Sequence, residues 1–254
     1  MINAEANSIA PNVWLGSYSV MWNWQFFDAN NIKVLINCAN TYEFMGAMQR
    51  SGIPIGSDTI VLSLDPWFNE DGLSESERQT MGEYYAQFNR TLQNYLSFFY
   101  HYNPNVGTLI HQLPQGAKLS INSPILAGNL KENLFNVNRM LKLLRVINPS
   151  IGVAILSPDG NSALSTAVAM SFYMDTYNFN FDASFRNLKS IRPSIHTLNY
   201  QFYDDLIIME SLKKFYQENI EIKQENDSLL TTNCKSKRKQ EYISVGGEHK
   251  RSRN

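Results

Sequence analysis

The segment "AILSPDGNSALS", residues 154–165, joins three structural signals within a short distance. Its apolar start, which ends at Ser157, indicates a buried strand; Pro158 and Gly160 indicate a turn; and a helical pattern begins after Ser162. A turn between a buried strand and a helix is where many α/β enzymes place a nucleophile or bind a phosphate. The segment contains no cysteine, histidine, arginine or lysine. The order of strand, turn and helix is therefore typical of a catalytic or phosphate-binding turn, but the side chains that such a turn uses are missing from the segment.

Two further apolar runs, residues 32–39 and 58–65, resemble the strand predicted at 150–157. All three are nearly continuous in hydrophobicity, which is typical of strands that are covered on both faces. A hairpin pattern covers 107–122, and helical patterns cover 74–102, 130–147, 165–174, 181–191 and 198–220. This alternation predicts an α/β domain in which a central, mostly parallel sheet is flanked by helices.

The helix predicted over residues 74–102 is long for a compact domain. Ser74 and Glu77 form a capping box at its start, and at ~1.5 Å per residue the helix would be roughly 40 Å long. One apolar stripe follows its length: Met81, Tyr85, Phe88, Leu92, Tyr95, Phe99 and Tyr102. The stripe packs on the protein's own core, or it serves a partner, because aromatic and methionine side chains are enriched at interfaces. We expect the 81–88 end to be packed, and we take Tyr95, Phe99 and Tyr102 as candidate partner-binding residues.

Composition narrows the class of protein further. The 254 residues are 43% hydrophobic and 18% charged, which provides enough apolar material for a sizeable core. No apolar run approaches the roughly 18 residues that a membrane span needs, and the first residues lack the features of a signal peptide. The two cysteines, Cys38 and Cys234, give neither a disulfide framework nor a zinc-ligand spacing. We therefore expect no metal, no cofactor and no membrane partner, and a reducing compartment.

Charge is divided between an acidic body and a basic end. Cys234–Asn254 holds seven lysines and arginines against two glutamates, while the whole chain has a net charge of −1. One basic cluster fits a nuclear-import signal: Lys235, Lys237, Arg238 and Lys239. It predicts a protein of the cytoplasm and nucleus. A solvated segment and non-specific contact with nucleic acid phosphates are the alternatives, of which nucleic acid binding is expected least.

Two distant segments carry motifs of one known family. "APNVWLGSYSV" (10–20), followed by "FDANNIKVLINCA" (27–39), matches an opening turn, helix and strand at Pro11, Trp14, Leu15, Gly16, Ile32, Val34, Leu35 and Asn37. "FDASFRNLKSIRPSIHTLNYQFYDDL" (181–206) matches a later motif at Ala183, Arg192, Pro193, Asn199, Phe202 and Leu206. In this order, on either side of residues 154–165, they resemble the dual-specificity protein phosphatases, and the resemblance implies that family's α/β fold.

The family's signature, His-Cys-x-x-Gly-x-Ser-Arg-Ser, falls on residues 154–165. Its register is fixed by Gly160, Ser162 and Thr166. The resemblance then implies that Leu156 replaces the histidine, Ser157 the nucleophilic cysteine and Ala163 the arginine that holds phosphate. A serine hydroxyl is harder to ionise than a thiol and needs an adjacent base. The chain is therefore identified as similar to the pseudophosphatases called phosphoserine/threonine/tyrosine-interaction proteins, with no catalytic residues.

Other positions of the resemblance carry further expectations. Asp65 falls near the family's general acid and would be vestigial without a nucleophile. Leu156 and Leu164 are expected to pack into the emptied pocket. Ala163 removes a positive charge from the loop and Asp159 adds a negative one, so phosphate or phosphopeptide binding is expected to be weak at best.

The resemblance covers roughly residues 8–65 and 130–210. It implies one phosphatase-like domain over residues 8–222 with a largely helical insertion at about 66–129. The polar, basic segment 223–254 is expected to be disordered.

The function expected first is that of a non-catalytic regulatory or scaffolding subunit that binds a protein partner. The alternative is an active protein tyrosine/serine/threonine phosphatase of the dual-specificity type that uses unrecognised catalytic residues. Cys38 lies on a predicted core strand, His101 and His111 lie in the insertion, and His196 lies in a connection. We therefore expect none of these four residues to be catalytic.

Overall fold

The structure, a computed structural model, describes residues 6–53, 55–102, 121, 123–195 and 202–211. The chain divides into two compact units, Met1–Glu210 and Ser211–Asn254, and the first unit contains the sheet and the helices that cover it. The predicted basic segment 223–254, with its import cluster, lies outside the described residues, as does most of the predicted hairpin at 107–122.

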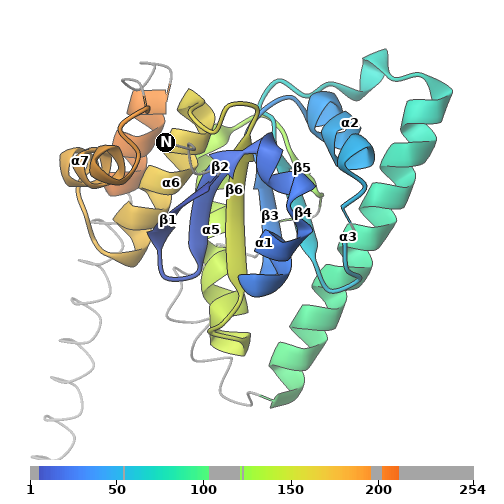
Figure 1. The fold of residues 1–254 in the computed structure, drawn as a ribbon, viewed down its shortest axis with the longest axis horizontal. Helices are drawn as coiled ribbons and strands as arrows, with labels where there is room; N and C mark the ends of the chain where they lie inside the picture. The colour runs from blue at the N-terminus through green and yellow to red at the C-terminus, as the bar shows by residue number, and fades with distance from the viewer. Residues whose placement is uncertain (1–5, 54, 103–120, 122, 196–201, 212–254) are drawn as a thin grey trace, which may run out of the picture. The chain divides into compact units, whose positions relative to one another are not determined.

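A six-stranded sheet, in the order β1-β2-β6-β3-β4-β5, forms the centre of the unit (Figure 1). Its strands are β1 (Ala6–Ala10), β2 (Val13–Ser17), β3 (Ile32–Asn37), β4 (Ile60–Leu64), β5 (Ile125–Leu126) and β6 (Gly152–Ser157). The edge strand β1 pairs antiparallel with β2, and all other neighbours pair parallel. The predicted class, an α/β fold with a mostly parallel central sheet flanked by helices, is confirmed.

Helices cover both faces of this sheet. They are α1 (Trp24–Ala29), α2 (Thr41–Ser51), α3 (Glu75–Tyr102), α5 (Leu130–Ile147), α6 (Ala163–Thr176) and α7 (Phe181–Ile191), with 3-10 turns η1 (Tyr18–Trp22) and η2 (Glu70–Gly72). Residues 202–211 are helical as well. The predicted helices at 130–147 and 181–191 are α5 and α7, whereas α2 and the β1–β2 hairpin were not predicted.

The core consists of two hydrophobic clusters, one on each face of the sheet. Residues of β6 alternate between them: Val153 and Ile155 join one cluster, and Ala154 and Leu156 join the other. We call the first the α5/α6 cluster, which includes Val34, Leu62, Leu134, Leu141, Val168 and Phe172. We call the second the α2 cluster, which includes Met21, Leu35, Phe44, Ala47 and Val61.

Helix α3 takes part in both clusters. Its capping box is formed as predicted, because Glu77 Oε2 accepts from the Ser74 N–H at 2.8 Å and the Glu77 N–H donates to Ser74 Oγ at 3.4 Å. Met81 and Tyr84 lie in the α2 cluster, and Phe88 and Leu92 lie in the α5/α6 cluster. The buried face turns slightly from the predicted stripe, since Tyr84 is buried and donates its hydroxyl to the Val61 carbonyl at 2.9 Å.

Candidate functional site

The turn between β6 and α6, residues 158–162, occupies the end of a central parallel strand. Ser162 caps α6, because its Oγ accepts from the N–H of Ser165 at 3.1 Å. The same hydroxyl reaches the carbonyl of Cys38, just beyond β3, at 3.3 Å. This 158–162 turn thus lies at the carboxyl edge of the sheet, where open α/β folds bind ligands.

Gly160 gives the turn its shape. Its φ is +72°, a left-handed conformation that suits glycine. A Cβ placed there would lie 2.7 Å from the carbonyl carbon of Gly16 and 2.8 Å from the nitrogen of Ser17, which belong to the backbone of β2. The turn therefore approaches β2 so closely that any side chain at this position would collide with the sheet.

Arg192 supports the 158–162 turn from the residue after α7. Its Nε donates to Asn161 Oδ1 at 2.8 Å, and its Nη2 donates to the Asp159 carbonyl at 3.4 Å. Its Nη1 donates to Asn7 Oδ1 at 2.6 Å and to the Leu15 carbonyl at 3.4 Å. Burial lowers the pKa of this guanidinium. The donors of Arg192 are thus used to join the turn to β1 and β2.

Ser157, the last residue of β6, is fully buried. Its hydroxyl lies 3.2 Å from that of Ser165, which in turn lies 3.1 Å from the hydroxyl of Ser162. A serine acts as a nucleophile when an adjacent base takes its proton, whereas the Ser157 hydroxyl lies against the hydroxyl of Ser165. In this arrangement Ser157 ties the strand end to the first turn of α6.

Two backbone donors of the 158–162 turn are used by neighbouring atoms of the chain. Pro158 has no N–H. The N–H of Gly160 donates to the Ser157 carbonyl at 3.3 Å, and that of Asn161 donates to Asp159 Oδ1 at 2.9 Å. The carboxylate of Asp159 therefore accepts from the N–H of Asn161, a donor that an anion-binding loop would direct at its ligand.

The two leucines that were expected to share an emptied pocket lie in different clusters. Leu156 is buried in the α2 cluster, and Leu164 is buried in the α5/α6 cluster. Ala163, half-buried at the first position of α6, packs against the latter. The expectation of a common pocket is wrong, because Leu156 lies on a strand and Leu164 on a helix that covers the opposite face.

Asp65 is buried one residue beyond β4 and holds the start of α2. Its Oδ2 accepts from the N–H of Thr41 at 2.8 Å and from the Thr41 hydroxyl at 2.9 Å. That hydroxyl lies 2.8 Å from Ser63 Oγ, which accepts from Asn37 Nδ2 at 2.7 Å. Tyr18 donates to Asn37 Oδ1 at 2.6 Å and completes a buried polar network. Asp65 is thus a structural carboxylate whose charge suits the positive end of a helix.

Cys38 is also buried, and burial raises the pKa of its thiol. A reactive cysteine needs an accessible thiolate in an electropositive setting, so this one packs in the core, as predicted. The side chain of His101 and the residues His111 and His196 lie outside the described part of the structure.

The candidate partner-binding residues all lie on the second half of α3 or at its end. Tyr95 is half-buried against the α5/α6 cluster and donates its hydroxyl to the Asp58 carbonyl at 2.8 Å. Phe99 and Tyr102 continue the same helix, and their side chains lie outside the described residues.

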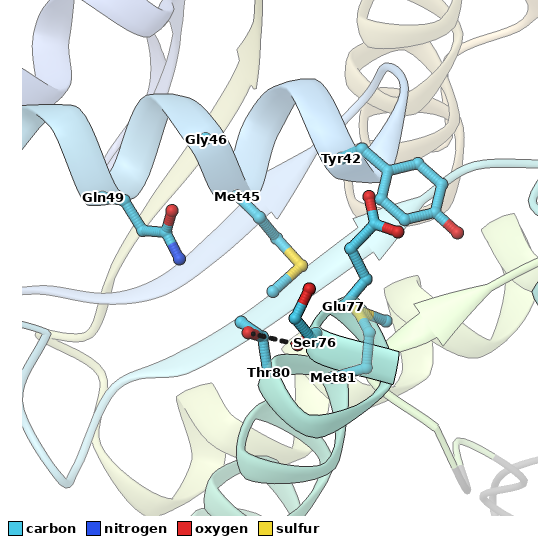
Figure 2. Close-up of a pocket in the computed structure, with 8 residues that line it drawn as sticks. All are labelled: Tyr42, Met45, Gly46, Gln49, Ser76, Glu77, Thr80 and Met81. Carbon is cyan, nitrogen blue, oxygen red and sulfur yellow. Dashed lines mark hydrogen bonds between the residues drawn. The ribbon is translucent and has the colours of Figure 1, made fainter. Parts of the chain in front are cut away.

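Sequence reasoning missed a groove between α2 and the first turns of α3 (Figure 2). Its volume is about 230 Å³. From α2 it is lined by Tyr42, Met45, Gly46 and Gln49. From α3 it is lined by Ser76, Glu77, Thr80 and Met81. The signal in the sequence is the i, i+3, i+4, i+7 spacing on α2, which places those residues on one helical face.

Among the described residues, no three histidine, cysteine, aspartate or glutamate side chains form a group that could hold a metal ion. Within the same residues, no helix has the length and apolar character to cross a membrane.

The sequence matches no family model and no curated protein, whereas several solved structures have a similar arrangement of the chain. Human DUSP28 aligns with a TM-score of 0.41 and 14% identity over 84% of this chain and 97% of its own. A leucine rich repeat and phosphatase domain containing protein from Entamoeba histolytica aligns with a TM-score of 0.45 and 15% identity, over 83% of this chain and 94% of its own. The human tyrosine phosphatase-like serine/threonine/tyrosine-interacting protein aligns with a TM-score of 0.46 and 13% identity, over 83% of this chain and 99% of its own. These structural neighbours are dual-specificity and protein tyrosine phosphatase-like folds.

Proposed function

We propose that this chain is a non-catalytic phosphatase-like protein that acts through protein–protein interaction as a regulatory or scaffolding subunit. The observation that carries the proposal is the state of Ser157. It stands where the resemblance places a nucleophile, yet it is fully buried and its hydroxyl lies against that of Ser165.

The groups that would assist a nucleophile are absent from the turn or used elsewhere. Ala163 stands where the resemblance places the arginine that grips phosphate. Arg192, which does contact the turn, donates to Asn161 and to Asp159 rather than outward. Asp65, the candidate general acid, is buried and accepts two hydrogen bonds from Thr41. Removing one transition-state donor commonly costs about 10²–10³ in rate, and here several groups are missing together.

Binding of a phosphorylated partner through the turn is disfavoured for a related reason. The turn carries the carboxylate of Asp159, which accepts from the N–H of Asn161. A phosphate would meet this negative charge, and Arg192, the cation that contacts the turn, already donates to Asn161, Asp159, Asn7 and Leu15. We therefore place the partner surface elsewhere, on the second half of α3, where Phe99 and Tyr102 extend the stripe beyond Tyr95.

Hydrolysis of para-nitrophenyl phosphate and of phosphotyrosine, phosphoserine and phosphothreonine peptides tests the absence of catalysis. The purified protein should release no phosphate above a buffer control, and Ser157→Ala should give the same baseline. Turnover that co-purifies with the protein and is removed by Ser157→Ala would establish the alternative, an active phosphatase. Turnover that survives that substitution would establish it with other catalytic residues.

The partner surface is tested with a pair of substitutions on one helix. Phe88→Ala should lower the free energy of unfolding by roughly 3–5 kcal/mol, since Phe88 is buried in the core. Phe99→Ala should leave stability nearly unchanged and abolish co-purification with a partner that the wild-type chain retains. Equal, severe destabilisation by both would remove this half of α3 as a partner surface.

A further inference from the structure

The groove between α2 and α3 has walls that suit an unbranched aliphatic stem. Met45 lines it from α2 and Met81 from α3, and Figure 2 shows the Met45 thioether directed toward α3. Methionine side chains are polarisable and adapt to the shape of a bound chain. Gly46 lines the same wall without a side chain of its own.

One end of the groove combines an aromatic ring with negative charge. Tyr42 lies there, with its ring packed on Phe68 at a centroid distance of 5.6 Å. Figure 2 shows Glu77 reaching from α3 toward Tyr42. Burial, followed by the charges of Glu77, Asp65 and Glu70, raises the pKa of the Tyr42 hydroxyl. A ring face beside carboxylates is a setting that attracts an ammonium or guanidinium group.

One oxygen of the Glu77 carboxylate can accept a hydrogen bond from a ligand. Its two hydrogen bonds from Ser74 both end on Oε2, at 2.6 and 2.8 Å, so that among the described residues Oε1 accepts none. These bonds lower the pKa of Glu77, which keeps it ionised at neutral pH. The segment 69–78 adds three more carboxylates and one arginine, so the region around this end is acidic.

A positive charge lies beside the α2 wall of the groove. The guanidinium of Arg50 lies beside Gly46, since a Cβ on Gly46 would meet Arg50 Nη1 at 3.1 Å. A second cation would be repelled there, whereas a carbonyl oxygen would be attracted. The charges of Glu77 and Arg50 therefore favour a cation on the side of Tyr42 and Glu77.

We propose that this groove binds the side chain of a single lysine or arginine presented by a partner protein. The aliphatic stem lies between Met45 and Met81, the cationic head lies between the Tyr42 ring and Glu77, and a backbone carbonyl of the partner faces Arg50. The inference rests on the proposed role as an interaction protein, and it does not depend on whether the 158–162 turn is inert.

Methionine-methyl NMR of the full-length protein tests the site directly. The probe is acetyl-Ala-Lys-Ala-amide, and the control is the same peptide with acetylated lysine. The lysine peptide should shift the methyl signals of Met45 and Met81 in a saturable way, with a dissociation constant roughly in the millimolar range, while Met170, buried in the α5/α6 cluster, should not respond. Equal shifts with the acetylated peptide, or none at Met45 and Met81, would overturn the proposal.

A matched pair of substitutions tests the role of Glu77. Glu77→Gln removes the charge but keeps a side chain that can serve the capping box, and it should weaken binding of the lysine peptide roughly two- to fivefold, the range of an exposed ion pair. Glu75→Gln makes the same charge change in the same turn, outside the groove lining, and should weaken it less. Equal losses of peptide affinity in the two variants would mean that the overall negative charge of this region, and not a contact with Glu77, attracts the peptide, and they would reject the site. Phosphate release in the hydrolysis assay would reject the non-catalytic role while leaving the groove untouched.

Discussion

Asp65 and Thr41 are joined by two hydrogen bonds to one carboxylate oxygen, from the Thr41 N–H at 2.8 Å and from its hydroxyl at 2.9 Å. They connect the end of β4 to the first turn of α2, at the edge of the sheet where the 158–162 turn also lies. Asp65, which the sequence resemblance placed near a general acid, thus holds the start of α2.

Asp65→Ala should therefore lower stability. It leaves the Thr41 N–H and hydroxyl without their acceptor in a buried place, which should cost about 1–3 kcal/mol in the free energy of unfolding measured with urea. Asp71→Ala, at an exposed position of η2, is the matched control and should change little. A loss no greater than that of the control would show that the Asp65–Thr41 contact is not structural.

Gly160→Ala should be far more damaging than the same change at Gly52. Both glycines are left-handed, with φ of +72° and +60°, but a Cβ on Gly52 meets nothing within 4 Å. Gly52→Ala should cost about 1–2 kcal/mol from backbone strain alone. At Gly160 the collision with β2 should raise the cost to roughly 3 kcal/mol or more. Thermal unfolding of the two variants compares them, and similar midpoints would contradict the close approach.

Tyr95→Phe should alter stability at alkaline pH. Burial, helped by the charge of Asp58, raises the pKa of Tyr95 to about 12 from its ordinary 10.0. The folded state holds this proton more tightly than the unfolded state, so its contribution is complete below pH 10 and is lost as the pH rises through about 12. Urea unfolding at several pH values should show a smaller alkaline loss in the variant than in wild type. Parallel curves would mean that the Tyr95 hydroxyl titrates normally.

Nuclear import through the basic cluster is a further proposal. In a fluorescent fusion too large for passive entry, replacing Lys235, Lys237, Arg238 and Lys239 by alanine should move the protein from nucleus to cytoplasm. Alanine at Lys250, Arg251 and Arg253, the second basic cluster, is the control for charge alone. An unchanged distribution in the first variant would remove the signal.

Much of the fold could be predicted because its signals are local. The buried strands at β3, β4 and β6 are continuous apolar runs, and α5 has a regular stripe that ends before Pro149. Helix α2 carried an Asn40 cap and a left-handed Gly52 after its end, but Gly46 inside it weakens the helical pattern. The two residues of β5 are too few to give any periodic signal.

The site was harder to predict because it depends on contacts between distant residues. The sequence shows that the 158–162 turn lacks a cysteine and an arginine, but it does not show where Arg192 directs its donors. Nor does it show that Asp65 is buried against Thr41. The groove beside Glu77 is formed by two helices that are separated in sequence by β4, so no single segment carries its pattern.

Because α3 contributes residues to both hydrophobic clusters, it affects how the domain unfolds. Met81 and Tyr84 belong to the cluster on one face of the sheet, and Phe88 and Leu92 to the cluster on the other. A rigid helix cannot leave one face and remain on the other, so the two halves of the core are mechanically coupled. Slow amide hydrogens on both faces should exchange in a single global opening. Helix α3 therefore links the two clusters, and we expect them to unfold together in one cooperative transition.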